Sequence, residues 1–174
     1  VARGAEDRRT AGADAFAAAC GSPNPYLVTT RAFDGVHGRD LAAQPVLFAF
    51  QDSADEDPGR QRPLASYAQL GTVYGLAFDP ARRQLYAAAF LKRGSLFPPG
   101  GPGSILRVDL ASAAVTPWAN LPAGPADRHR LSAGEDAAAL DAVGRMGLAD
   151  IDIDPQSEVL FAANLLDGRI YRLS

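Results

Sequence analysis

Short runs of apolar and β-branched residues alternate with turn residues along most of this chain, a pattern typical of antiparallel β-strands. Two of these runs are joined by an Asp-Pro turn, and the unit occurs twice. Leu76–Pro80 with Leu85–Phe90 aligns without a gap with Ile151–Pro155 and Leu160–Leu165, which begin 75 residues later. Each copy predicts an antiparallel hairpin. Internal repetition of such units is typical of propeller and solenoid proteins.

The strand pattern extends beyond the two hairpins. A third strand is expected after each of them, at 104–109 and at 169–173. A fourth strand is expected at 114–121, and 64–70 is its earlier counterpart because Tyr67 aligns with Trp118. The remaining expected strands are 26–33 and 46–50. The sequence therefore predicts an all-β fold of about ten strands, a partial β-propeller of four-stranded antiparallel blades with fewer than three full blades.

The same pattern predicts the organisation of the chain. An N-terminal extension over 1–25 precedes a propeller-like domain over 26–174, with partial blades at 26–70, 73–121 and 147–174. Insertions at 91–103 and 122–145 interrupt the repeat. In the second insertion, Ser132 to Glu135 has the spacing of a capping box and predicts one short surface helix that ends at Gly144. Another short helix is expected in the extension, starting near Ala11.

The small number of blades has a consequence for partners. A closed propeller needs at least about four blades, and an open one leaves sheet faces and strand edges exposed to association. We therefore expect either that the chain is a piece of a longer propeller or that a protein partner covers the open blade faces.

Composition narrows the classes of function. The chain has 174 residues, 47% of them hydrophobic, with a formal net charge of −3. This size fits one domain. Basic residues form no continuous stripe, which argues against nucleic acid, and no run of 18 apolar residues predicts a transmembrane segment. The single cysteine, Cys20, excludes a disulfide within the chain; it follows three alanines, but charged residues upstream argue against a lipoprotein signal.

Five stretches of the chain carry a distinctive pattern: Gly71–Asp79, Leu85–Arg93, Pro99–Ile105, Val143–Ile153 and Asn164–Asp167. Together they resemble a family of secreted or cell-surface bacterial β-propeller proteins of poorly defined function, some with serine–aspartate-repeat-type B domains. The resemblance covers roughly residues 26–174. It implies an extracytoplasmic location, either periplasmic or secreted, and association with a membrane-bound or cell-surface assembly. It supplies no catalytic residue.

The acidic strand Asp150-Ile151-Asp152-Ile153-Asp154 is the sharpest candidate for chemistry. Alternation along a strand puts its three carboxylates on one face. Asp154 also belongs to the repeated Asp-Pro turn, so Asp150, Asp152 and the isolated Asn164 are the candidate calcium ligands, because calcium prefers oxygen ligands. Such a site would fit a calcium-dependent propeller hydrolase of the lactonase type. The alternative is that these carboxylates are solvated or salt-bridged, with no cofactor.

The two insertions are the candidate binding surfaces, because loops on a rigid scaffold commonly carry function. The residues expected to contact a protein partner are Lys92, Arg93, Phe97, Arg128 and His129. His37 and His129 lie in polar segments, so both are expected to be surface loop residues rather than catalytic ones. We therefore expect a non-catalytic interaction module, an accessory or structural subunit of a larger assembly. The alternatives are the calcium-dependent hydrolase and a carbohydrate-binding propeller.

Overall fold

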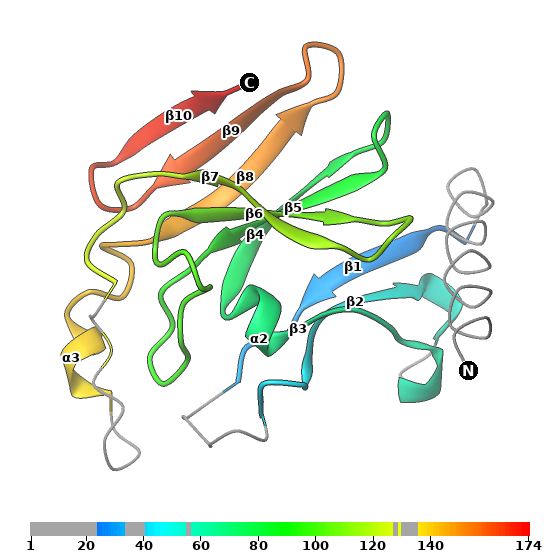
Figure 1. Ribbon diagram of the computed structural model, residues 1–174, viewed down its shortest axis with the longest axis horizontal. Helices are drawn as coiled ribbons and strands as arrows, with labels where there is room; N and C mark the ends of the chain where they lie inside the picture. The colour runs from blue at the N-terminus through cyan, green and yellow to red at the C-terminus, as the bar shows by residue number, and fades with distance from the viewer. Residues whose placement is uncertain (1–23, 34–40, 55–56, 127–128, 130–135) are drawn as a thin grey trace.

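The computed structural model describes residues 24–33, 41–54, 57–126, 129 and 136–174. These ranges form ten strands in three antiparallel sheets with a few short helical segments (Figure 1). The expected all-β fold is confirmed. The expected helix in the N-terminal extension, Cys20, His37 and the Ser132 to Glu135 capping box lie outside the described residues.

The strands connect in simple order along the chain. They are β1 Tyr26–Thr30, β2 Pro45–Gln51, β3 Arg62–Ser66, β4 Val73–Asp79, β5 Gln84–Ala89, β6 Ser104–Asp109, β7 Val115–Asn120, β8 Leu148–Asp154, β9 Val159–Asn164 and β10 Arg169–Leu173. The helical segments are η2 Asp52–Ala54, η3 Pro58–Arg60, α2 Tyr67–Leu70 and α3 Ala137–Leu140. The first sheet has the order β1-β2-β3, the middle sheet β4-β5-β6-β7 and the last sheet β10-β9-β8, so sequential strands within each sheet are neighbours.

The sequence repeat is reproduced in the backbone of the middle and last sheets. Leu76 pairs with Ala87 in the first copy, and Ile151 pairs with Ala162 in the second. Both copies have a register shift at the same place, just before these pairs. Both also place a non-glycine residue with positive φ in the hairpin turn, Arg83 at 54° and Glu158 at 56°. The repeat therefore fixes the strand irregularity and the turn as well as the strands.

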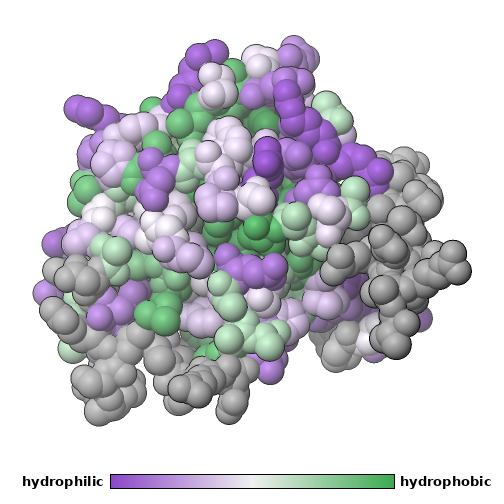
Figure 2. Space-filling model, viewed as in Figure 1, coloured by the Kyte–Doolittle hydropathy of each residue, from purple (hydrophilic) through white to green (hydrophobic). Residues whose placement is uncertain are grey.

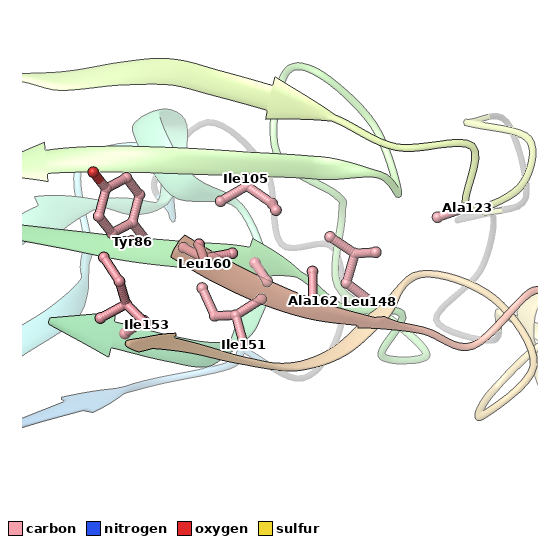
Figure 3. Close-up of a cluster of buried hydrophobic side chains, with 10 residues drawn as sticks. Tyr86, Ile105, Ala123, Leu148, Ile151, Ile153, Leu160 and Ala162 are labelled. Carbon is pink, nitrogen blue, oxygen red and sulfur yellow. The ribbon is translucent and has the colours of Figure 1, made fainter. Parts of the chain in front are cut away.

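The middle sheet is covered on both faces. One face packs against the first sheet through a core of Val46, Leu47, Ala65, Leu70, Val73, Leu85, Ala87, Leu106 and Val108. The other face packs against the last sheet through a core of Ala77, Tyr86, Ala88, Ile105, Ala123, Leu148, Ile151, Ile153, Leu160 and Ala162 (Figure 3). Five consecutive residues of β5, from Leu85 to Ala89, are consequently buried.

The middle and last sheets meet most closely where β8 passes over β4. A Cβ atom on Gly75 would lie 2.8 Å from the backbone nitrogen of Ile151 and 2.9 Å from Cα of Asp150. Only a residue without a side chain permits this approach of two backbones. At the turns, the Arg82 guanidinium bonds the carboxylates of Asp79 and Glu158, so one cation joins the hairpin turns of both copies.

Two elements differ from the sequence prediction. The strand expected at 64–70 is instead β3 followed by α2, which begins where the Ser66 N–H donates to Oε1 of Gln69 at 2.9 Å. Tyr67 is therefore not a counterpart of Trp118: it contacts the Phe33 ring edge-on, whereas Trp118 packs on Tyr86. The helix expected up to Gly144 is one turn only, α3, because Asp141 to Gly144 form turns.

Candidate functional site

The two insertions of the middle repeat fold against each other at one end of the molecule. Leu91 from the first insertion packs with Ala139 and Ala142 from the second and with Met146 directly after it, and Phe97 covers this cluster. The cluster is separate from the two cores between the sheets. In Figure 1, α3 and the green loop that follows β5 lie at the same end of the molecule. We call residues 91–97 and 136–147 the insertion platform.

Asp136 joins the parts of the platform. Its Oδ2 lies 2.5 Å from Nδ1 of His129 and accepts a hydrogen bond of 3.0 Å from the Gly94 N–H. The His129 ring also contacts the Phe97 ring, with 4.8 Å between centroids. The side chains of His129 and Asp136 are 4% and 1% exposed. The expectation that His129 is a surface loop residue is therefore wrong.

The His129–Asp136 pair connects the two insertions. Asp136 accepts the hydrogen bond of the Gly94 N–H and the His129 ring contacts the Phe97 ring, and both Gly94 and Phe97 belong to the first insertion. The Nε2 atom of His129 is buried with no hydrogen-bond partner among the described residues.

The loop that carries Lys92 and Arg93 is also tied to the body of the protein. A tight turn brings Lys92 opposite Ser95, with Gly94 at a φ of 77°. The Ser95 hydroxyl is fully buried and bonds the hydroxyl of Thr72. One residue further, the Leu96 N–H donates to the Tyr67 hydroxyl at 2.6 Å. The loop is thus a supported part of the structure.

The outer surface of the platform combines apolar and basic side chains. Leu96, Leu140 and Val143 are 40%, 57% and 44% exposed. Among its charged residues, Arg93 and Arg145 are exposed and Lys92 is half-buried. Hydrophobic and strongly polar residues lie side by side around α3 in Figure 2. Supported loops with exposed apolar groups are suited to protein contact.

The structure brings together some of the expected partner-binding residues. Phe97 and His129 are in contact, and Lys92 and Arg93 lie in the same insertion as Phe97. Arg128 lies outside the described residues. Sequence reasoning missed Asp136 and Leu140, because the sequence pattern predicts only that both lie in a short surface helix. Acidic and aliphatic residues in a helical stretch carry no sign of such a role until the fold supplies their neighbours.

The candidate calcium ligands do not form one group. Asp150 and Asp152 are exposed, and each accepts a hydrogen bond from the N–H of the next residue, at 2.9 and 2.8 Å. Asn164 is 2% exposed and shares a face of β9 with Ala162, on the side that packs against the middle sheet. Its amide donates to the Pro122 carbonyl at 3.1 Å and accepts from the Leu166 N–H at 2.9 Å.

Asn164 therefore fixes the second insertion to the last sheet and faces away from the two aspartates. Within the described ranges, no group of three or more His, Cys, Asp and Glu side chains is placed to hold a metal ion.

The repeated aspartates at the turns are structural. Burial raises the pKa of Asp79, but hydrogen bonds and the charge of Arg82 outweigh this effect and lower it overall. Hydrogen bonds from Ser157 and the Gln156 N–H lower the pKa of Asp154. At neutral pH both are carboxylates that accept hydrogen bonds within their own turn, as expected for Asp before Pro.

Comparison with known proteins gives partial matches. No protein-family model matches the chain. The chain is similar to Colossin-A of Dictyostelium discoideum, with 38% identity over 66 residues, which is 38% of this chain and 1% of Colossin-A. It is also similar to Colossin-D of the same organism, with 32% identity over 71 residues, which is 38% of this chain and 8% of Colossin-D. The chain thus spans a small fraction of both relatives.

These relatives correct the expected family. Both are proteins of a eukaryote, so the resemblance to a bacterial propeller family is not supported and that assignment is wrong. The periplasmic or secreted setting that the resemblance implied has no support among these relatives. In the described part of the chain, none of the helices has the length and apolar character needed to cross a membrane.

Proposed function

We propose that this chain is a non-catalytic protein-interaction module in which a stack of β-sheets presents the insertion platform to a protein partner. In this proposal the three sheets are blades of a partial β-propeller, one complete and two of three strands. The matching registers and turns of the middle and last sheets support the interpretation as repeated blades. The packing of each face of the middle sheet against another sheet supports it as well.

The observation that carries the proposal is the separate small core under the platform. In the last sheet, β9 passes to β10 through the short turn Leu165–Gly168. In the middle sheet, the same connection extends over 90–103 and packs on the second insertion. Insertions that only lengthened a loop would need no buried His–Asp pair and no apolar core of their own. Their ordering costs conformational entropy, which is consistent with a surface kept for recognition.

The chemistry of the platform indicates the kind of partner. Both parts of the platform carry exposed apolar side chains, Leu96 on one and Leu140 and Val143 on the other, and such side chains fit an apolar patch on another protein. The charges of the platform are mainly positive, since Lys92, Arg93 and Arg145 outnumber Asp141 and the buried Asp136. We therefore infer a partner whose apolar patch has acidic groups at its edge. Binding of this kind weakens as salt screens the charges.

The test is a comparison of variants as bait in an extract of the source cells. Leu140→Asp places a charge on the exposed surface of α3 without changing a residue of the buried cluster, and the wild-type chain is the reference. We expect one protein to bind wild type and to lose at least about tenfold in affinity for Leu140→Asp. Phe161→Asp, on the opposite copy of the repeat, is the matched control and should bind that protein as wild type does. Equal binding of all three chains would contradict the proposal.

A further inference from the structure

The face of the last sheet that points away from the middle sheet carries large apolar side chains that are exposed. Phe161 is 39% exposed and Ile170 is 74% exposed. Both lie on the face opposite to Leu160 and Ala162, which are buried against the middle sheet. Ala163 lies between them, paired with Ile170 across the strands. This outer face of β8, β9 and β10 is defined by Asp152, Phe161, Ala163, Ile170 and Arg172.

The middle sheet shows what the equivalent face of the other repeat copy packs against. The equivalent positions in the middle sheet are Ala77, Tyr86, Ala88, Ile105 and Arg107. There, Tyr86 is 5% exposed and Ile105 is fully buried, because the last sheet packs on them. The same positions, with similar aromatic, small and aliphatic side chains, therefore form a sheet-to-sheet interface in one copy. In the other copy they are open to solvent.

The charged residues of the outer face indicate which protein docks on it. Across the outer face, Asp152 pairs with Phe161, and Phe161 pairs with Arg172. One row thus reads acidic, aromatic, basic, and both charged residues are exposed. The middle sheet lacks this feature, because Ala77 takes the acidic position. A row of this order is self-complementary: rotation by 180° about an axis along β9 places the acid of one copy over the base of the other.

We propose that a second copy of this chain docks on the outer face of the last sheet, forming a twofold dimer with Phe161 at its centre. Asp152 of each copy faces Arg172 of the other, and Phe161 packs on its own symmetry mate. Twofold symmetry requires such a self-complementary patch, and two sheets pack face to face about 10 Å apart. The proposal concerns a different surface from the insertion platform and does not depend on it.

The small size of the outer face limits the affinity that we expect for the dimer. Three strands of five to seven residues form it, which is small beside the about 800 Å² per partner of a standard interface. The dimer is therefore expected to depend on protein concentration, with single chains on dilution. Salt should weaken it, because two of its central contacts are exposed ion pairs.

Sedimentation equilibrium of the whole chain tests the proposal with charge-swap variants. We expect wild type to dimerise and Phe161→Asp to stay monomeric at every concentration. Asp152→Arg alone and Arg172→Asp alone should each weaken self-association about tenfold or more, because each creates two like-charge contacts. An equimolar mixture of these two variants should form a heterodimer, and the double variant D152R/R172D should dimerise as wild type does.

Controls separate this result from unfolding and from failure of the platform. Each variant should keep the far-UV circular dichroism of wild type. Leu140→Asp, on the platform, should dimerise normally. A wild-type chain that remains single at all concentrations would overturn the proposal, and it would do so even if the platform binds its partner. Self-association that is unaffected by the charge reversals, or that the mixture fails to recover, would overturn it as well.

Discussion

The middle and last sheets carry the same repeat, yet the same positions are interior in one and surface in the other. Tyr86 and Phe161 are equivalent, and they are 5% and 39% exposed. Gly75 and Asp150 are also equivalent; the first lies against a neighbouring backbone and the second faces solvent. The repeat therefore determines strands, registers and turns, whereas burial depends on whether a neighbouring sheet is present. Matched substitutions in the two copies test this comparison.

Removing the aromatic ring at the equivalent positions Tyr86 and Phe161 should give the largest difference in stability. Tyr86→Ala leaves a cavity between the sheets and removes the contact with the Trp118 ring, 4.9 Å away. We expect it to lower the free energy of unfolding by about 4 kcal/mol. Phe161→Ala should lower it by less than about 1 kcal/mol in dilute protein. Urea unfolding of both variants measures the difference, and equal losses would contradict the inferred difference in burial.

Alanine at the point of closest backbone approach should give the next largest effect. In Gly75→Ala the new Cβ would lie within 3 Å of the backbone of Ile151 and Asp150, so β8 must move. We expect a loss of about 2–3 kcal/mol. Asp150→Ala puts the same residue at the equivalent position of the last sheet, where it should change stability by less than about 0.5 kcal/mol. Thermal unfolding of the pair is the measurement, and a neutral Gly75→Ala would show that the two strands are further apart.

Neutralising the turn aspartates should again cost different amounts of stability in the two copies of the repeat. Asp79 is 2% exposed and accepts hydrogen bonds from the Arg82 backbone and guanidinium. Asp79→Asn weakens a charged, buried contact and should cost about 2 kcal/mol. Asp154→Asn affects an exposed turn and should cost clearly less. Chemical denaturation at neutral pH compares them, with Asp152→Asn as the control outside both turns.

Low pH should remove the stabilisation that the buried Asp79 carboxylate provides. The pKa of Asp79 in the folded chain is below its ordinary value of 3.8, so the unfolded chain binds the proton more readily. Its contribution to stability is therefore fully present above pH 3.8 and is lost as pH falls through the folded pKa. The difference in unfolding free energy between wild type and Asp79→Asn should shrink over that range. A difference that stays constant down to the acid limit would show that the charge of Asp79 contributes little.

Much of the fold could be predicted because the repeat is local in sequence. The Asp-Pro turns and apolar runs identified both hairpins and the strands that follow them. The alignment of Tyr67 with Trp118 predicts a strand at 64–70. Ser66 followed by Gln69 at capping distance is the stronger local signal, and a helix begins there instead. The predicted number of strands is still correct, because β3 lies only slightly earlier than the strand expected at 64–70.

The candidate site was less predictable because its contacts are distant in sequence. His129 and Asp136 lie in a polar segment, and their burial depends on Phe97 and on Gly94 of the other insertion. Asn164 stands out in the sequence because the equivalent residue of the first copy, Ala89, is an alanine. The structural reason for an asparagine is its bond to Pro122, 42 residues away, and no pattern within one repeat contains that information.

The sandwiching of β5 between two sheets also has a consequence for the order in which the molecule opens. Its amides bond to β4 and β6 on either side, and its side chains are shielded above and below by both cores. Exchange of those amide protons with solvent deuterium therefore requires both neighbouring sheets to separate, whereas β1 and β10 can detach singly. Strand β5 should be the slowest-exchanging segment of the described chain and the last to lose its structure.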